Sequence, residues 1–503
     1  MKVIIPASGT GERFIAAGYE KTKPLIDVNS SIKIIDYVIN CFDKENDEFF
    51  IITSGETYDV MDEYLSSKQI NYKHILYTGE KLGPVGAIYY SVSELTKYIR
   101  EGDQIIVSYC DYGMVWDYNS FLSFIRDNDP DGCIPCYKGY HPHLENPQNV
   151  YAACKVFDGS NRIFDVKEKY ESNNRLRELW SAGLYYFKSF ALMLDAFKKN
   201  IENKDTLNEE YYVSIAYNYI LEKNILVYDK IRKFYQFGTP DDFEYAKSKL
   251  TMLENFDNEV TNIENIVILS AGKGERFLNL DFKQPKPFLP LGDSFLVDNI
   301  KKTFDNNSDN IRFVGSRDHS LFWENSNLNV TYVKPNKIGA AYSYKESCSD
   351  INGEALIVPC DLIAKHITPL FKKLKETADV IIFTADPTDY SEQHPDSFAW
   401  VSGSNNSINE ISIKKKIKKE KSQMVLIGSF WVRSNDLLIK HINRIFESKF
   451  SVNGEYYLDN AFKDMLDVGI TVNYIKLDKY FSFGTPEEYN DSKYWLDEKF
   501  NER

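Results

Sequence analysis

Short apolar runs alternate with amphipathic stretches along the whole chain. The runs EFFIITS (48–54), DQIIVSYCD (103–111) and GEALIVPCD (353–361) have the length and the β-branched content of strands buried on both faces. Stretches such as 31–42 and 294–304 instead space their apolar residues at helical intervals. This alternation predicts βαβ units, and therefore parallel strands covered by helices.

One long pattern of the chain occurs twice. PASGTGERFIAAGYEKTKP (6–24) resembles SAGKGERFLNLDFKQPKP (270–287), and each follows an apolar run. Further pairs follow in the same order, including GPVGA with NKIGA, NEEYYVSIA with NGEYYLDNA, and FYQFGTPDD with YFSFGTPEE. Ordered matches of this kind predict a duplicated domain. We expect domains at 1–252 and 264–503, joined by an acidic, asparagine-rich linker at 253–263.

Composition narrows the class of protein. The formal net charge is -14, which disfavours a general nucleic-acid binder, because such proteins displace counterions with basic surface. No apolar stretch approaches the length of a membrane span, and the apolar start MKVII is too short for a signal peptide. Seven cysteines in apolar surroundings favour reduced thiols and a cytoplasmic location.

The two glycine-rich segments have the character of phosphate-binding loops. Each follows a predicted strand and opens a predicted helix, which leaves backbone N–H groups free for an anion. A third glycine is missing, so the dinucleotide fingerprint fails, and the P-loop pattern fails because Glu12 and Arg13 follow Gly11. What remains is G-x-G-x-R followed by Lys-Pro. Arginine can clamp two phosphate oxygens, and lysine supplies a compact charge to another.

This pattern resembles the sugar-phosphate nucleotidyltransferases, which include the nucleoside-diphosphate-sugar pyrophosphorylases and the cytidylyltransferases. The resemblance covers both halves of the chain. It implies two tandem Rossmann-like (GT-A-like) α/β domains, each a mostly parallel sheet flanked by helices. It also implies transfer of a nucleoside monophosphate from a nucleoside triphosphate to a phosphorylated small acceptor, with release of pyrophosphate. A sugar product of that kind would serve the synthesis of a surface polysaccharide such as a capsule.

The resemblance also assigns residues. It gives charge stabilisation of the departing pyrophosphate to Arg13 and Lys23, and to Arg276 and Lys286. It gives the phosphate of the acceptor to Lys169 and to the aligned Lys414, for which a charged solvated strand is the alternative. Nucleotide binding falls to Ala7, Ser8, Gly9, Thr10, Gly11, Gly83 and Gly86 in the first half, and to Ala271, Gly272, Lys273, Gly274 and Gly339 in the second. Within this set we pair Gly86 with Gly339.

A divalent cation, Mg²⁺ or Mn²⁺, is the expected cofactor. Asp111 and Asp361 follow strongly apolar runs, at the sheet edge where open α/β sheets bind ligands, and carboxylates suit this hard cation. Many members of the family carry a second aspartate before the late G-T-P motif, but this chain has Gln236 and Ser482 there. Either one carboxylate holds the metal together with phosphates and waters, or another carboxylate substitutes, with Glu210 and Glu455 as candidates.

Three interpretations of the duplication and of the class of protein stay open. Both halves catalyse, which makes the chain bifunctional, or one half is a regulatory or non-catalytic nucleotide-binding copy. A GT-A glycosyltransferase is the third reading, although such enzymes usually show Asp-x-Asp where this chain has Cys-Asp-Tyr and Cys-Asp-Leu. The expected partners are a nucleoside triphosphate and a phosphorylated acceptor, without nucleic acid or membrane insertion, and a homo-oligomer is left open.

Overall fold

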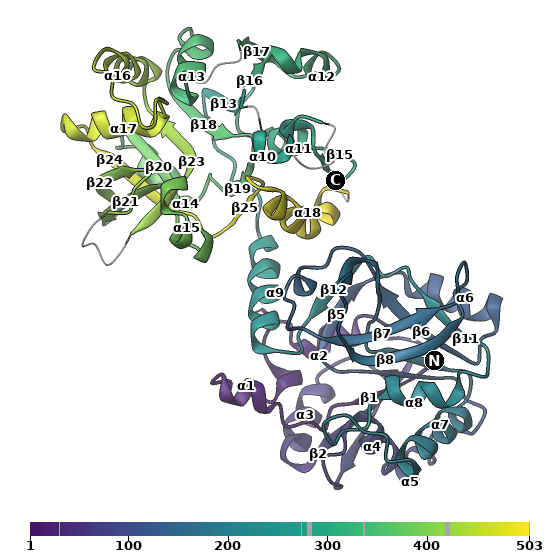
Figure 1. Cartoon of the computed structure of the whole chain (residues 1–503). Coiled ribbons are helices and arrows are strands. Elements are labelled where there is room, and N and C mark those ends of the chain that lie inside the picture. Colours follow the sequence, from purple (N-terminus) through teal and green to yellow (C-terminus); the bar gives the residue numbers. More distant parts are fainter. Residues whose placement is uncertain (30, 273, 279–283, 335–337, 418–422, 502–503) are drawn as a thin grey trace. The chain divides into compact units, whose positions relative to one another are not determined.

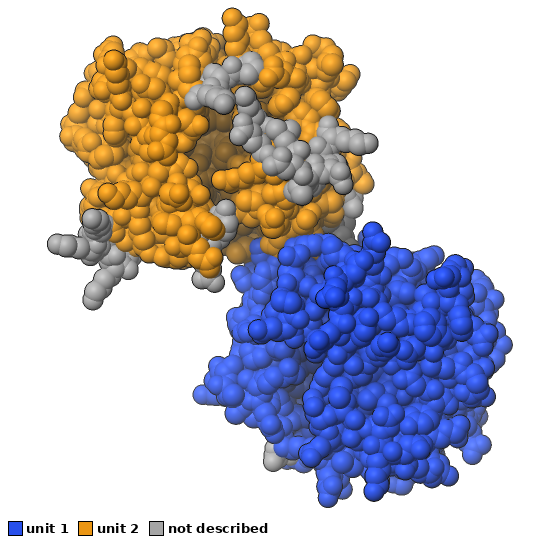
Figure 2. Space-filling view, in the orientation of Figure 1, with its two compact units in different colours: residues 1–251 blue, residues 252–503 orange. Residues whose placement is uncertain are grey.

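The chain forms two compact units, Met1–Thr251 and Met252–Arg503 (Figures 1 and 2). The computed structural model describes residues 1–29, 31–272, 274–278, 284–334, 338–417 and 423–501. Lys273, predicted as a nucleotide-binding residue, lies outside the described residues. Among the residues that are described, no helix is both long and apolar enough to cross a bilayer.

The first unit is built on one large mixed sheet. Its strands lie in the order β3 (Tyr72–Tyr77), β2 (Glu48–Ser54), β1 (Lys2–Pro6), β4 (Ile105–Ser108), β10 (Leu184–Phe187), β6 (Gly132–Tyr137), β9 (Leu179–Ser181), β7 (Tyr151–Val156) and β8 (Ile163–Tyr170), with β11 (Ile225–Tyr228) beside β6. The first four are parallel, as expected. From β10 onward most neighbours are antiparallel, so the expected parallel arrangement describes the half that carries the glycine-rich loop.

Helices cover both faces of this sheet, which explains why its central strands read as continuous apolar runs. Ile4 of β1 packs in one core and its neighbours Val3 and Ile5 pack in the other; all three are fully buried. The helices are α1 (Glu12–Ala16), α2 (Ile34–Ile39), α3 (Gly55–Ser66), α4 (Gly83–Tyr89), α5 (Val92–Leu95), α6 (Tyr118–Asn128), α7 (Phe190–Glu202), α8 (Val213–Tyr217) and α9 (Pro240–Leu253). A separate ribbon pairs β5 (Tyr112–Val115) with β12 (Lys233–Gln236).

The second unit repeats this order of parallel and antiparallel strands. Its sheet runs β17 (Val330–Val333), β16 (Ile311–Ser316), β13 (Asn265–Ser270), β18 (Ala355–Pro359), β23 (Met424–Val432), β20 (Val380–Ala385), β24 (Val472–Lys476), β22 (Ser407–Ile413) and β21 (Ala399–Ser404). The first four strands are again parallel, and β23 is antiparallel to β18. A ribbon of β19 (Leu362–Ala364) and β25 (Tyr480–Ser482) corresponds to the β5–β12 ribbon, and β14 (Pro290–Leu291) pairs with β15 (Ser294–Phe295).

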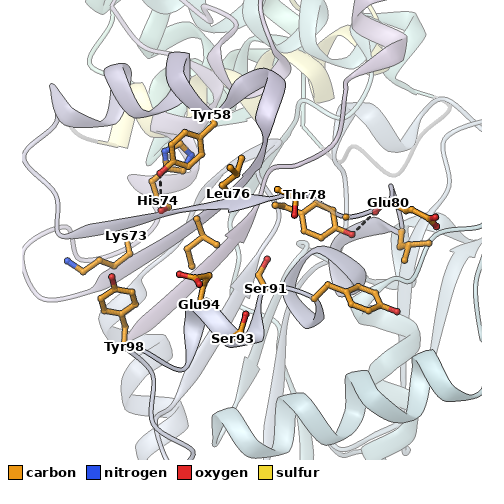
Figure 3. Close-up of a pocket in the computed structure, with 15 residues that line it drawn as sticks. Tyr58, Lys73, His74, Leu76, Thr78, Glu80, Ser91, Ser93, Glu94 and Tyr98 are labelled. Atoms are coloured by element: carbon orange, nitrogen blue, oxygen red, sulfur yellow. Dashed lines mark hydrogen bonds between the residues drawn. The ribbon is translucent and has the colours of Figure 1, made fainter.

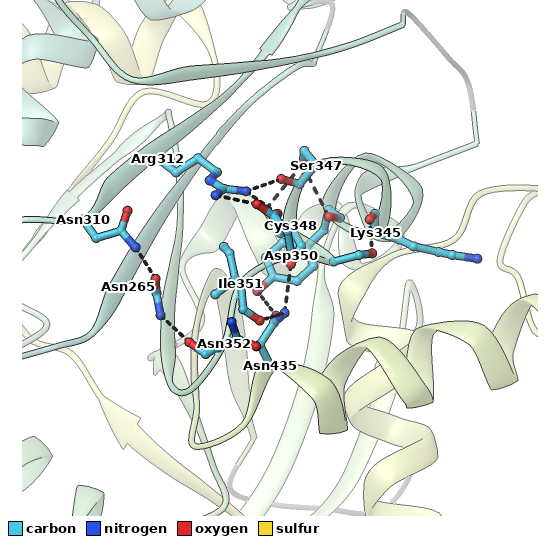
Figure 4. Close-up of polar contacts among 12 residues, drawn as sticks. Asn265, Asn310, Arg312, Lys345, Ser347, Cys348, Asp350, Ile351, Asn352 and Asn435 are labelled. Atoms are coloured by element: carbon cyan, nitrogen blue, oxygen red, sulfur yellow. Dashed lines mark hydrogen bonds and ion pairs between the residues drawn. The ribbon is translucent and has the colours of Figure 1, made fainter.

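The helices of the second unit are α10 (Glu275–Leu278), α11 (Leu296–Lys302), α12 (Ser320–Glu324), α13 (Ala340–Cys348), α14 (Pro369–Lys375), α15 (Asp389–Gln393), α16 (Asn435–Glu447), α17 (Leu458–Asp467) and α18 (Pro486–Asn501). A polar network fixes the end of α13 (Figure 4). The fully buried Asn435 donates to the carbonyls of Cys348 and Ile351, at 2.9 Å each, and accepts from Tyr344. The Cys348 carbonyl also accepts the Ile351 N–H, so this amide adds a second donor there and supplies the donor for the Ile351 carbonyl just beyond the helix end.

The predicted strands and helices agree with the observed ones at particular positions. EFFIITS is β2, and the two segments predicted as helices contain α2 and α11. Residues 254–264 contain neither helix nor strand, and they contact the second unit: Phe256 packs on Phe481, and Asn307 donates to the carbonyl of Glu259. The acidic segment is therefore a packed part of the second unit rather than a free tether.

Candidate active site

A lysine and an aspartate meet at the centre of the first unit. Lys23 Nζ donates to Asp111 Oδ2 at 2.6 Å and to the carbonyl of Gly238 at 3.1 Å. Lys23 follows the glycine-rich loop, and Asp111 lies just beyond β4. The lysine side chain is 13% exposed and that of the aspartate 28%, so the pair is shielded but still reaches solvent.

Gly11 positions this lysine. Its φ of 68° lies in the left-handed region, where a side chain is strained, and a Cβ there would come within 3.3 Å of Lys23 Cβ. Gly9 is exposed, and a Cβ there would meet no atom within 4 Å. Ala7 ends the buried strand and donates its N–H to the carbonyl of Ile52 at 2.7 Å. The loop, including the partly exposed Ser8 and Thr10, thus runs from the buried sheet to the surface.

The second unit reproduces this geometry. Lys286 Nζ donates to Asp361 Oδ2 at 2.6 Å, and Gly274 has a φ of 62° with a Cβ position 3.3 Å from Lys286 Cβ. In both loops the lysine also lies over the phenylalanine that follows the arginine, at 5.3 Å in the first unit and 5.4 Å in the second. The partly exposed Ala271 and the exposed Gly272 precede this turn.

A cavity of about 560 Å³ in the first unit brings together several of the predicted site residues. Arg13, Asp111, Lys169 and Gly238 all line it, although they come from four distant parts of the chain. Arg13 is exposed, whereas its neighbour Phe14 is buried, so the arginine is held at the rim by an anchored phenylalanine. One cavity therefore brings together a rim arginine, a carboxylate and a second lysine.

Lys169 sits at the end of β8 in an unusual backbone conformation. Its φ is 49°, and Lys414 of the second unit, just past β22, has a φ of 59°. A residue other than glycine in this region is uncommon and persists where the surroundings hold it. Lys169 Nζ lies 5.1 Å from the Tyr212 ring, and Lys414 Nζ lies 5.2 Å from the Tyr457 ring.

The two glutamates considered as metal ligands are engaged elsewhere. Tyr212 donates to Glu210 at 2.6 Å, and Tyr457 donates to Glu455. Each hydrogen bond holds the ring beneath the corresponding lysine. Burial lowers the pKa of the Lys414 ammonium, and Arg276 adds to this, while Asp459 opposes it. Lys414 Nζ donates to the carbonyl of Ser397 at 2.9 Å, so it is a positioned residue rather than part of a solvated charged strand.

The pairing of Gly86 with Gly339 is wrong, because Gly83 is the counterpart of Gly339. Gly83 has a φ of 79° and Gly339 of 118°, and in each a Cβ would strike the backbone of the EYY segment, at Tyr211 or Tyr456. Tyr211 N–H donates to the Leu82 carbonyl, and Tyr456 N–H donates to the Ile338 carbonyl. Gly86 lies instead inside α4, against Leu82. A one-helix-turn shift in the sequence alignment caused the error, since both GPVGA and NKIGA end in Gly-Ala.

Metal ligands are sparse around the aspartates. No group of three His, Cys, Asp or Glu side chains able to hold a metal occurs in the part of the chain that the structure describes. Gln236 accepts from the Gly238 N–H at 3.2 Å, and Ser482 donates to Glu488 at 2.9 Å. The residues present therefore fit a cation held by one carboxylate and completed by phosphate oxygens and water, which is common for Mg²⁺, and do not fit a cage made of protein alone.

A larger cavity of the first unit, about 750 Å³, lies elsewhere (Figure 3). It is lined by residues of α3, β3 and α5 and of the segments beside them, and it contains none of the predicted site residues. Within it, the His74 and Tyr58 rings stack at 4.0 Å, and His74 contacts Thr53 at 2.7 Å and Asp62 at 3.1 Å. Burial lowers the pKa of His74. The histidine packs as a structural residue, so the smaller cavity is the candidate site.

Sequence reasoning missed two residues of the smaller cavity region. Glu168 lines the cavity beside Lys169, and Ser214 of α8 donates a hydrogen bond to it. Burial raises the pKa of Glu168, while Ser214 and Lys169 act in the opposite direction. The sequence does mark both residues, because they fall inside the repeated segments at positions where the two copies differ.

Known proteins are similar to about half of this chain. The Bifunctional protein GlmU of Methanococcus aeolicus is 26% identical over 234 residues, which cover 45% of this chain and 53% of that protein. GlmU of Methanocaldococcus jannaschii is 24% identical over 243 residues, covering 47% and 55%. The chain thus spans about half the length of the curated relatives it matches.

Solved structures are also similar. The nucleoside-diphosphate-sugar pyrophosphorylase of Vibrio cholerae RC9 is 20% identical, with a TM-score of 0.41, over 49% of this chain and 99% of that one. The inositol-1-phosphate CTP transferase of T. maritima is 19% identical, with a TM-score of 0.37, over 48% and 98%. The family model for nucleotidyl transferases matches residues 2–252, the extent of the first unit. Through these residues the chain belongs to the nucleotidyl transferase family.

Proposed function

We propose that this protein transfers a nucleoside monophosphate from a nucleoside triphosphate to a phosphorylated small acceptor and releases pyrophosphate. The observation that carries the proposal is the cavity of the first unit, in which Arg13, Asp111 and Lys169 converge. The relatives named above that act on sugar or inositol phosphates support a phosphorylated polyol or sugar as the acceptor.

The reaction needs no protein base, because a phosphate monoester is already a nucleophile. One of its oxygens attacks the α-phosphorus, and the bond from that phosphorus to the bridging oxygen of the β-phosphate breaks. The electron pair leaves with pyrophosphate. Arg13 and Lys23 meet the charge that develops on the departing group, and Lys169 holds the acceptor phosphate in line.

Lys23 and Lys169 lie on separate elements, which suits their separate roles at the departing pyrophosphate and at the acceptor phosphate. Lys169 lines the cavity from the end of β8, and Lys23, from the segment after the glycine-rich loop, pairs with Asp111 at the cavity wall. The strained backbone of Lys169 fixes the direction of its side chain, and the Tyr212 ring supports it. Catalysis then rests on positioning and charge neutralisation.

A divalent cation belongs to this proposal. Asp111 in the first unit and Asp361 in the second would hold it, together with phosphate oxygens of the nucleotide. When bound, the cation would neutralise phosphate charge during the displacement. Lys23, paired with Asp111 at 2.6 Å, keeps the carboxylate charge balanced at this position.

We also propose that both units are nucleotidyltransferase domains derived from one duplication. The common strand order, the two Lys–Asp pairs at 2.6 Å and the two left-handed lysines support this. The alternative, a catalytic first unit with a regulatory second copy, is supported by one observation: the family-model match at residues 2–252 falls on the first unit. The use of the product for a surface polysaccharide is a proposal that rests on resemblance.

A pyrophosphate-release assay tests the function. Each common nucleoside triphosphate is combined with hexose 1-phosphates, polyol phosphates and phosphocholine, using the full chain and its Arg13→Ala and Arg276→Ala variants. We expect a triphosphate-acceptor pair that releases pyrophosphate, and a loss of turnover in one or both variants. If neither variant lowers turnover, the assigned mechanism is wrong. If no pair releases pyrophosphate, the transferase proposal fails.

A further inference from the structure

The two units place a carboxylate beside the acceptor-side lysine in different ways. In the first unit the residue before Lys169 is Glu168, which lines the cavity. In the second unit the residue before Lys414 is Ile413, which packs against the hydrophobic core. The strand that ends at the lysine therefore offers a carboxylate in one unit and an apolar side chain in the other.

On the helix beside this strand the difference is reversed: the first unit has the uncharged residue and the second unit has the carboxylate. In the segment EYYVSIA the fifth residue is Ser214, at the start of α8, whereas in EYYLDNA it is Asp459, at the start of α17. The segments correspond in structure as well, since Tyr211 and Tyr456 contact Gly83 and Gly339 in the same way. Each unit thus has one carboxylate at this pair of positions, on the strand in the first and on the helix in the second.

A direct contact shows that the two positions share one space. Ser214 Oγ donates to Glu168 Oε2, so the helix position lies within one hydrogen bond of the strand carboxylate. A carboxylate carried by the helix therefore enters the same region from the other side. Burial raises the pKa of Asp459 to about 6, and the Lys414 ammonium opposes that rise. Glu168 responds in the same way to burial and to Lys169.

We propose that Asp459 is the acceptor-reading carboxylate of the second unit, entering from α17 where the first unit uses Glu168 from β8, so that the two units select different phosphomonoesters. This inference rests on the proposed function. In each unit the lysine holds the phosphate, and the carboxylate accepts hydrogen bonds from hydroxyl groups of the acceptor body. Because Asp459 approaches from the helix, it meets a differently placed hydroxyl.

Ile413 adds to the difference that we expect between the acceptors of the two units. A hydroxyl that donates to Glu168 in the first unit would face an apolar side chain in the second, and an unpaired polar group there is unfavourable. The second unit therefore favours an acceptor with a hydrogen or methyl group at that position and a hydroxyl toward the helix. The chain as a whole would activate two different phosphorylated polyols or sugars.

The test uses the full chain with one unit silenced at a time. Lys23→Ala silences the first unit and Lys286→Ala the second, and each chain is assayed for pyrophosphate against the same panel of hexose 1-phosphates, 6-deoxyhexose 1-phosphates and polyol phosphates. We expect two different acceptor rankings. In the Lys23→Ala chain, Asp459→Asn and Asp459→Ser lower kcat/KM for the preferred acceptor by about tenfold to a hundredfold, and leave the KM of the triphosphate unchanged. Asp467→Asn, an exposed change on the same helix, is the control.

A double substitution in the second unit tests whether the element that carries the carboxylate, strand or helix, decides which acceptor is preferred. Ile413→Glu combined with Asp459→Ser gives the second unit the arrangement of the first, and we expect its acceptor ranking to shift toward that of the first unit. Unchanged kcat/KM in both Asp459 variants overturns the inference, as do identical rankings. Pyrophosphate release by the first unit but by no acceptor in the second also overturns it, while leaving the proposed function of the first unit intact. Circular dichroism melting of every variant separates misfolding from lost recognition.

Discussion

Lys23 Nζ donates to Asp111 Oδ2 at 2.6 Å, across 88 residues of chain. The contact joins the glycine-rich loop to the sheet edge beyond β4, so it fixes where a cation stands relative to a carboxylate before any substrate arrives. Because Lys286 and Asp361 repeat it at the same distance, the arrangement belongs to the fold of both units rather than to one local sequence.

Removal of Lys23 tests its role in charge stabilisation. We expect Lys23→Ala to lower kcat of the first unit by about a hundredfold to a thousandfold, the usual cost of losing one preorganised group that meets transition-state charge. Lys21→Ala is the matched control, because Lys21 is exposed and pairs with Asp27 at the surface. The assay measures pyrophosphate release in a Lys286→Ala background. Equal turnover in the two lysine variants would contradict the role.

Gly11 offers a test of loop geometry. Gly11→Ala adds left-handed strain of about 1–2 kcal/mol and presses a Cβ toward Lys23 Cβ. Gly18→Ala adds similar strain at a φ of 89°, with no atom within 4 Å of the new Cβ. We expect both variants to lose similar thermal stability, but only Gly11→Ala to raise the KM of the triphosphate. A matching rise for Gly18→Ala would show that strain alone, rather than displacement of Lys23, affects binding.

Lys169 should act on the acceptor rather than on the nucleotide. Lys169→Ala removes a charge-assisted hydrogen bond, so we expect the KM of the acceptor to rise about tenfold or more with little change for the triphosphate. Lys167→Ala removes an exposed lysine from the same strand and is the control. Lys169→Gly also relieves the left-handed backbone and should melt no lower than Lys169→Ala. A rise in the KM of the triphosphate alone would place Lys169 at the other substrate.

The raised pKa of Asp459 predicts that the stability of the second unit depends on pH. Its pKa is raised from 3.8 to about 6, so the folded second unit binds the proton more tightly than the unfolded chain does. Stability from this group is therefore present at low pH and is lost as the pH rises through 6. We expect Asp459→Asn to be more stable than the natural chain at pH 7–8, and the difference to vanish below about pH 4. Calorimetry across this range measures it, with Asp467→Asn expected to show no such trend.

The network around Asn435 predicts a large loss of stability without a change in chemistry. Asn435→Ala removes the donor to the Ile351 carbonyl and the acceptor of the buried Tyr344 hydroxyl, so we expect the free energy of unfolding of the second unit to fall by about 2–5 kcal/mol. Asn352→Ala removes only an exposed side chain nearby and should cost little. Two-transition calorimetry of the full chain checks both, since the first unit provides an internal reference. A small effect of Asn435→Ala would mean that water replaces its hydrogen bonds.

Much of the fold was predictable because buried parallel strands leave a strong signal. Residues 49–52 of β2 are apolar at consecutive positions because both faces of the sheet are covered, and the repeat placed the glycine-rich loops and both aspartates in equivalent surroundings. The antiparallel half of each sheet was not predicted, because its short strands, such as β9, lack a period long enough to read.

The site was predictable where one residue type carries the chemistry, as for Lys23 and Asp111. It was missed where the proposed role belongs to a pair of positions, although the two copies differ there. Ser214 and Asp459 each look ordinary in a single sequence, and only the contact between Ser214 and Glu168 shows that strand and helix share one space. The misplaced pairing of Gly86 with Gly339 has a similar origin, since a backbone contact rather than a residue type defines that turn.

The contact between Gly83 and the backbone of Tyr211 has a mechanical consequence. Leu82 and Val85, in the turn around Gly83 that we predict to bind the nucleotide, exchange hydrogen bonds with Tyr211, and the next residue, Tyr212, supports the Lys169 ammonium. The turn and the acceptor lysine are thus joined by one short, rigid length of backbone. We expect a displacement at one end to move the other, so the nucleotide and acceptor subsites proposed for this unit would change shape together.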